Sequence, residues 1–142
     1  MIRVVLADDH PSIRGAIRLK LERDGIEVVG EAGDGREAVD LVGSLHPEVV
    51  LLDCNMPHMG GLEAARAIRE KDPQAKIILL TSDDEPETMS EAARIGTRAY
   101  LFKDDPSEYL VRTVHLVHGG GFGPRMRGAP EEPAPTARGS DV

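Results

Sequence analysis

Two patterns of hydrophobic and polar residues alternate along this chain, one typical of strands and the other typical of helices. Short runs rich in Val, Ile and Leu, each bounded by Gly, Pro, Asp or Ser, are typical of buried strands. Between these runs, apolar residues recur three and four positions apart, which predicts helices with one buried face. The pattern therefore predicts five strands that alternate with five helices, the strands lying at about residues 2–7, 26–30, 48–53, 76–81 and 98–102.

Residues at the expected helix ends agree with this reading. Asp34 and Glu37 have the spacing of a capping box ahead of the second helix. Gly25 and Gly96 stand where the first and fourth helices should end, because glycine adopts the left-handed conformation at little cost. The expected start signals of the last two helices are Asp84 with Glu87, and Asp105 with Pro106 and Glu108.

The alternation also predicts the fold class and the place of a binding site. Wholly apolar strands separated by helices indicate a parallel sheet covered on both faces, so we expect a three-layer α/β sandwich. In such sheets, ligands bind beyond the carboxyl ends of the strands. The polar residues expected at those ends are Asp8, Asp9, Asp53, Thr81, Ser82 and Lys103.

Three of these residues, Asp8, Asp9 and Asp53, are carboxylates that one cleft would bring together. Carboxylates in one cleft repel each other unless they share a proton or bind a divalent cation. A few solvent-accessible oxygen donors suit Mg²⁺, which keeps several waters and commonly binds a phosphate as well. The pattern therefore favours Mg²⁺-dependent phosphate chemistry.

Composition narrows the class of protein. The 142 residues suit a single domain, and a lone cysteine, Cys54, excludes an internal disulfide framework. The formal charge of −8 argues against direct DNA binding, which needs clustered Lys and Arg, and favours protein partners. No signal peptide or membrane-spanning apolar stretch opens the chain, so we expect a cytoplasmic protein without membrane contact.

The character of the chain changes at residue 119. The last 24 residues contain six of the 15 glycines and four of the 10 prolines, a composition that does not favour a packed core. We therefore expect one folded domain over residues 1–118, followed by a flexible tail over residues 119–142.

Several motifs resemble those of a known family. The segments VVLADDHPSIR, VVLLDCNMP, HMGGLEAARAIR, IILLTSDDE and AYLFKDD are similar to response-regulator receiver domains, and DDHP and FKDD resemble the NarL/FixJ-type branch. The resemblance covers about residues 1–118. It implies a flavodoxin-like fold with strand order 2-1-3-4-5 and a role in two-component signal transduction. The partner it implies is a sensor histidine kinase or a phosphotransfer protein.

The resemblance also implies roles for individual residues. Asp53 matches the phosphoacceptor, which attacks the phosphoryl group of a phosphohistidine. Asp9 matches the direct Mg²⁺ ligand and Asp8 the acid that acts through metal-bound water, while Asn55 lends its backbone carbonyl. Together with Asp53, these residues form the implied metal site. Self-catalysed phosphotransfer and autodephosphorylation are the only enzymatic activities implied.

Three further residues match the family's functional residues, Thr81 and Lys103 as catalytic residues and Thr81 and Tyr100 as the switch. Lys103 matches the ammonium that contacts a phosphoryl oxygen, and Thr81 matches the hydroxyl that turns toward it. Tyr100 matches the aromatic residue that rotates into the space Thr81 leaves. The implied readout face comprises the fourth helix, the fifth strand and the fifth helix, and homodimerisation through this face is a hypothesis.

Two other functions remain open from the residues. A haloacid-dehalogenase-type phosphatase also combines Asp, Thr, Lys and Mg²⁺, but it requires a second acid two positions after the nucleophile, where Asn55 stands. A receiver-like module that binds partners without phosphorylation is the other alternative. Relatives of this branch usually continue into a helix-turn-helix domain, so the chain is either a stand-alone receiver or part of a truncated regulator.

Overall fold

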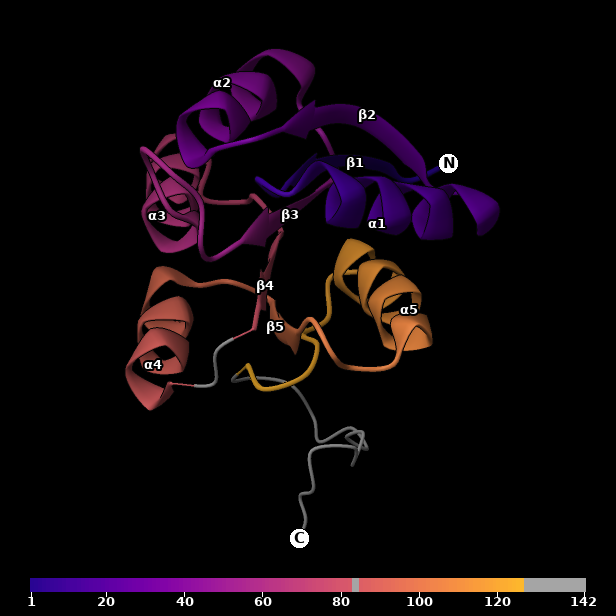
Figure 1. The fold of residues 1–142 in the computed structure, drawn as a ribbon. Helices are drawn as coiled ribbons and strands as arrows, with labels where there is room; N and C mark the ends of the chain where they lie inside the picture. The colour runs from indigo at the N-terminus through magenta and orange to yellow at the C-terminus, as the bar shows by residue number, and fades with distance from the viewer. Residues whose placement is uncertain (83–84, 127–142) are drawn as a thin grey trace, which may run out of the picture.

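The computed structural model describes residues 1–82 and 85–126, in which strands and helices alternate as expected (Figure 1). The strands are β1 (Arg3–Ala7), β2 (Glu27–Ala32), β3 (Val49–Asp53), β4 (Ile77–Thr81) and β5 (Ala99–Phe102). The helices are α1 (Pro11–Arg23), α2 (Gly35–Leu45), α3 (Gly61–Lys71), α4 (Pro86–Ile95) and α5 (Ser107–His118).

All strands are parallel, in the order β2-β1-β3-β4-β5, which confirms the predicted topology. Figure 1 shows α1 and α5 on one side of the sheet and α2, α3 and α4 on the other. Each side has its own hydrophobic core, because alternate strand residues point to opposite faces. Leu6 packs toward α1 and α5, while its neighbour Ala7 packs toward the other three helices.

The apolar burial fixes the strand register, since a slip of one residue would turn every side chain to the wrong face. In that register Asp53 of β3 lies opposite Leu80 of β4, and Thr81 lies opposite Phe102 of β5. The carboxyl ends of β3, β4 and β5 are therefore level, and the residues that end them share one edge of the sheet.

Glycine allows α2 and α3 to pack against the segment that follows β3. A Cβ atom added to Gly61, the first residue of α3, would lie 2.3 Å from the backbone oxygen of Asp53. At Gly35, the first residue of α2, it would lie 2.3 Å from the backbone oxygen of Met59. Real Cβ atoms do not approach backbone so closely, so both positions require glycine.

The helix ends show which local predictions hold. The side chain of Asp34 accepts a hydrogen bond from the Glu37 N–H (2.8 Å), and the side chain of Glu37 accepts one from the Gly33 N–H (2.8 Å), which confirms the capping signal. Gly25 (φ 81°) and Gly96 (φ 96°) are left-handed, as expected at helix ends.

The predicted cap of the last helix is wrong. Helix α5 begins at Ser107 with Pro106 as the capping residue, and no side chain caps it. The carboxylate of Asp105 instead accepts a hydrogen bond from the Phe102 N–H at 2.9 Å and pairs with Arg125. These partners occupy the carboxylate oxygens that a helix cap would offer to the first amides of α5. Helix α4 begins at Pro86, and the other expected cap, Asp84, lies outside the described residues.

The first part of the expected tail also packs against the domain. The Gly123 N–H donates to the Arg98 oxygen (2.7 Å), and the Pro124 oxygen accepts from the Tyr100 N–H (3.1 Å). Met126 is only 4% exposed, so this Gly/Pro-rich segment carries an apolar anchor. Residues up to 126 of the expected tail therefore contact the domain, and residues 127–142 lie outside the described part of the chain.

Candidate functional site

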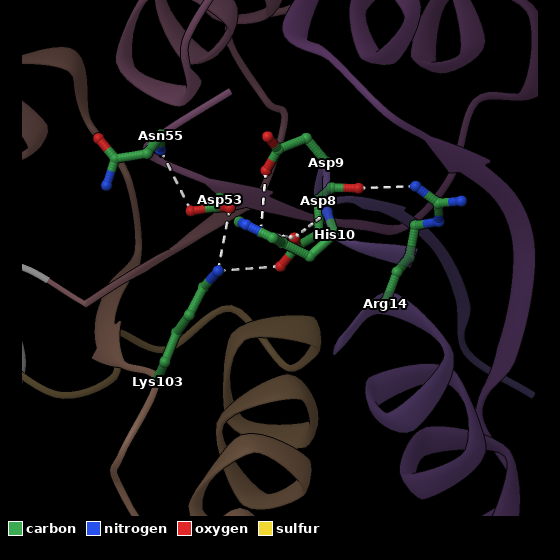
Figure 2. A network of polar contacts seen from close by, with 7 residues as sticks. All are labelled: Asp8, Asp9, His10, Arg14, Asp53, Asn55 and Lys103. Atoms are coloured by element: carbon green, nitrogen blue, oxygen red, sulfur yellow. Dashed lines mark hydrogen bonds and ion pairs between the residues drawn. The ribbon is translucent and has the colours of Figure 1, made fainter. Parts of the chain in front are cut away.

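Three side chains that are far apart in the sequence meet beyond the carboxyl ends of the strands (Figure 2). The Nζ atom of Lys103 lies 3.0 Å from Oδ2 of Asp8 and 3.0 Å from Oδ2 of Asp53. The Asp8 and Asp53 side chains are 0% and 2% exposed. One ammonium group therefore bridges two buried carboxylates.

Asp9 and His10 extend this cluster toward solvent. One oxygen of Asp9, Oδ1, is buried and accepts no hydrogen bond within the described part of the chain. Nδ1 of His10 lies 3.1 Å from this oxygen, and the two groups form an ion pair only when His10 is protonated. Oxygen atoms of Asp8, Asp9 and Asp53 and one ring nitrogen of His10 all lie within 4.8 Å of one another.

This arrangement fits a divalent cation. A buried polar atom normally has a hydrogen-bond partner, so the unsatisfied oxygen of Asp9 is suited to a ligand outside the chain. The cluster holds the three carboxylates of Asp8, Asp9 and Asp53 against the single ammonium of Lys103. Its carboxylate oxygens are the donors that Mg²⁺ prefers.

Hydrogen bonds from backbone N–H groups and from Arg14 hold this acidic cluster in place. Oδ1 of Asp53 accepts a hydrogen bond from the Asn55 N–H at 3.1 Å, and Oδ1 of Asp8 accepts one from the His10 N–H at 2.9 Å. Arg14 donates through Nη1 to the Asp8 carbonyl (2.7 Å) and through Nε to Glu31 (2.9 Å). Arg14 therefore ties the start of α1 to the acidic pair at the end of β1 (Figure 2).

The other expected site residues lie at the same edge or beside it. Asn55 is exposed, and Figure 2 shows its amide side chain directed away from Asp53. Thr81 ends β4 fully buried, and its backbone oxygen accepts the Lys103 N–H at 2.8 Å. Tyr100 is fully buried in β5, with its ring edge-on to that of Phe102 at a centroid distance of 5.9 Å.

Burial and the neighbouring charges shift the pKa values of two groups in this cluster. Burial raises the pKa of Asp53, and the hydrogen bonds from Lys103 and Asn55 oppose this rise only in part. Burial by itself lowers the pKa of Lys103, but hydrogen bonds to Asp53 and Asp8 outweigh it, so this pKa is raised. Lys103 therefore stays charged at neutral pH, and an added cation would stabilise the ionised form of Asp53.

Sequence reasoning missed the supporting residues. Arg14 lies one turn into a helix that follows an acidic pair, and this position is the only signal that could have indicated its contact with Asp8. The need for Gly61 is visible only once α3 is packed onto the end of β3. The ring of His10, which is 60% exposed, also borders the cluster.

The sequence is similar to those of known response regulators. A model of the response regulator receiver domain matches residues 4–115. The nitrate/nitrite response regulator protein NarP of Escherichia coli is 42% identical over 113 residues, which cover 79% of this chain and 53% of NarP. The probable transcriptional regulatory protein NarL of Mycobacterium tuberculosis is 34% identical over 154 aligned positions, which cover 99% of this chain and 71% of that protein.

Solved structures agree with the sequence relatives. The signal receiver domain of NarL from Mycobacterium tuberculosis superposes with a TM-score of 0.80 at 36% identity, covering 84% of this chain and 97% of that domain. The chain spans about half the length of several curated relatives that it matches. No helix within residues 1–82 and 85–126 has the length and apolarity needed to cross a membrane. On sequence and fold together, the chain belongs to the response regulator receiver domain family.

Proposed function

We propose that this chain is a phosphorylatable receiver that accepts a phosphoryl group on Asp53 from the phosphohistidine of a sensor histidine kinase or phosphotransfer protein. The observation that carries the proposal is the environment of the Asp53 carboxylate. It is buried, it is held by Lys103 on one oxygen and by the Asn55 N–H on the other, and it borders Asp8 and Asp9. A carboxylate fixed in this way is positioned to act as a nucleophile.

In the proposed reaction, an oxygen of Asp53 attacks the phosphorus atom and an acyl phosphate forms. The bond from phosphorus to the donor imidazole nitrogen breaks, and that nitrogen keeps the electron pair and takes up a proton. Phosphoryl transfer depends mainly on alignment and on neutralising charge on the phosphoryl oxygens. Lys103, already 3.0 Å from Asp53, is the protein's own source of positive charge at this point.

Mg²⁺, when bound, supplies the further positive charge that the reaction requires. Asp9, Asp53 and the backbone carbonyl of Asn55 are the proposed direct ligands, with Asp8 acting through bound water. The buried, unsatisfied oxygen of Asp9 supports this assignment. Arg14 holds the carbonyl of Asp8 and so limits the movement of the two adjacent acids.

The same site is proposed to act as a switch through Thr81 and Tyr100. Phosphorylation exchanges one negative charge for about two and adds acceptor oxygens, which the Thr81 hydroxyl can approach. Both side chains are fully buried and lie on neighbouring strands, and the proposed switch couples a movement of Thr81 to one of Tyr100. The phosphate can shift the two states only by its different interaction with each.

Neither alternative function gains support. The phosphatase requires an acid at the position of Asn55, whose side chain is an amide directed away from Asp53. A module that binds without phosphorylation does not need three clustered carboxylates with a bridging lysine. Homodimerisation through α4, β5 and α5 remains part of the proposal, and sizing with and without a phosphodonor tests it.

The test is incubation with a small acyl phosphate donor and Mg²⁺, followed by intact-mass measurement and an assay of donor consumption. The proposal predicts a single added phosphoryl group per chain and donor use that stops near one equivalent. Sustained donor turnover would instead identify a phosphatase. An unchanged mass would identify a module that is not phosphorylated by this route. Asp53→Asn is the control and should remain unmodified.

A further inference from the structure

Residues 122–126, here called the C-terminal strap, lie along β5 beyond the last helix of the domain. Backbone hydrogen bonds join Gly123 to Arg98 (2.7 Å) and Pro124 to Tyr100 (3.1 Å). At the far end Met126 is buried, and its sulfur accepts a hydrogen bond from the Thr97 hydroxyl at 3.2 Å. The strap therefore occupies the edge of β5 and is anchored at both ends.

Arg125 is the polar anchor of the strap. Its guanidinium lies over the Phe102 ring, 4.3 Å from the centroid, and Nη1 donates to the Tyr100 oxygen at 2.9 Å. Nη1 and Nη2 also pair with the two carboxylate oxygens of Asp105 at 3.2 and 3.3 Å. The Arg125 and Asp105 side chains are only 17% and 3% exposed, so removing one partner leaves the other poorly solvated.

The partner of Arg125 holds the turn that carries Lys103. The carboxylate of Asp105 accepts a hydrogen bond from the Phe102 N–H (2.9 Å), and the Asp105 N–H donates to the Phe102 oxygen (3.0 Å). Lys103 lies inside this closed turn, and its ammonium reaches Asp53. A continuous set of contacts therefore leads from Arg125 through Asp105 and the turn to the proposed phosphoacceptor.

We propose that Arg125 is a positioning residue: by docking the strap on Asp105 and β5, it holds Lys103 in the conformation that accepts the phosphoryl group. This inference rests on the proposed function of Asp53. Because coupling between two sites is reciprocal, a phosphoryl group held by Lys103 should in turn tighten the strap. The strap thereby connects the chemistry at Asp53 to the segment that continues beyond the domain.

The first test uses the unaltered chain. Beryllium fluoride with Mg²⁺ serves as a stand-in for the phosphoryl group, and amide exchange at Gly123 and Tyr100 is followed by NMR. The inference predicts that exchange at both amides slows about fivefold or more, the scale of a modest allosteric coupling. Unchanged or faster exchange at these amides in a protein that has bound the probe would overturn it.

The second test compares variants of the full chain. Arg125→Ala should weaken beryllium fluoride binding and slow labelling by the small acyl phosphate, each by about fivefold or more. Arg125→Lys should recover part of the loss, because it restores charge without the two-pronged pairing. Arg36→Ala, which replaces an exposed arginine on α2, is the matched control and should behave like the unaltered chain.

A third variant separates the strap from a purely local effect of the Arg125 charge. Met126→Ser loosens the apolar anchor but leaves Arg125 and Asp105 in place, so the inference predicts a loss in the same direction as Arg125→Ala. Normal labelling of both Arg125→Ala and Met126→Ser would overturn the inference while leaving the proposed function intact. Failure of the unaltered chain to be labelled would instead overturn the proposed function.

Discussion

Lys103 and Asp53 are 50 residues apart in the sequence, yet the Lys103 ammonium lies 3.0 Å from the Asp53 carboxylate. The same ammonium is 3.0 Å from Asp8, so it offsets the repulsion between two buried acids before any ligand arrives. Because its pKa is raised by these partners, it remains charged over the physiological range. This single group therefore both stabilises the unphosphorylated site and is available to contact an incoming phosphoryl oxygen.

Lys103→Ala should slow labelling of Asp53 by a small acyl phosphate roughly tenfold to a hundredfold, because a fixed positive donor is lost where charge develops. Mg²⁺ binding should persist, since the carboxylates remain and lose their competing cation. Labelling kinetics and calorimetric Mg²⁺ titration measure the two effects separately. Lys76→Ala, which removes a lysine bonded to the His118 carbonyl, is the control. Loss of Mg²⁺ binding together with labelling would contradict the separate roles.

Gly61→Ala should destabilise the protein by about 1–3 kcal/mol, because the added Cβ forces α3 away from the end of β3. The clash is with the backbone oxygen of Asp53, at 2.3 Å, so no side-chain rotation relieves it. Gly15→Ala is a matched control inside α1 with nothing within 4 Å of the new Cβ. It should stabilise by about 0.4–1 kcal/mol. Urea unfolding measures both changes. Equal changes in the free energy of unfolding for the two variants would show that the close approach of α3 to the end of β3 does not require glycine.

Asp53→Asn should stabilise the Mg²⁺-free protein at neutral pH. The pKa of Asp53 in the folded protein is raised above its ordinary value of 3.8. The stabilisation that protonated Asp53 gives the folded state is therefore fully present below pH 3.8 and is lost as the pH rises through the raised pKa. The free energy of unfolding should therefore fall more with rising pH in the unaltered chain than in Asp53→Asn. Urea titrations from acid to neutral pH measure this difference.

Asp40→Asn, an exposed acid on α2, is the control for that series and should keep the pH dependence of the unaltered chain. Saturating Mg²⁺ should recover the stability lost near neutral pH, since it binds only the folded cluster. If the free energy of unfolding changes with pH in the same way for the unaltered chain and Asp53→Asn, ionisation of Asp53 does not destabilise the folded protein.

Arg14→Met should weaken Mg²⁺ binding about tenfold, because groups that hold metal ligands in place commonly have effects of this size. Arg14 bonds both the Asp8 carbonyl and Glu31, whereas Arg18 pairs with Glu31 and Glu22 without contacting Asp8. Arg18→Met is therefore the matched control, and calorimetric titration with Mg²⁺ compares the two. An equal loss of affinity in both variants would assign the effect to Glu31 rather than to Asp8.

The strand ends of this protein could be predicted from the sequence because their signal is local. Asp53 directly follows an apolar run, and parallel strands bring their carboxyl ends to one edge, so its meeting with Asp8 follows from topology. The capping pair Asp34 and Glu37 was predictable for the same reason, because both partners lie within one turn.

The contacts of Asp105 and of the strap were not predictable in this way. Asp105 has the spacing of a helix cap, but Arg125 and the Phe102 N–H compete for its oxygens once the strap is docked. The strap itself was hidden by its Gly/Pro-rich composition. Only Phe122 and Met126 could have indicated locally that the strap packs, because large apolar residues in such a segment favour burial against the domain.

Phosphorylation of Asp53 is tested by locating the phosphoryl group on the chain. The chain is incubated with a small acyl phosphate and saturating Mg²⁺, the acyl phosphate is trapped by borohydride reduction, and peptide mass spectrometry identifies the modified residue. We expect modification at Asp53 alone, with none at Asp8 or Asp9. Modification at either of those acids with Asp53 intact, or no modification in a chain that remains folded, would contradict it.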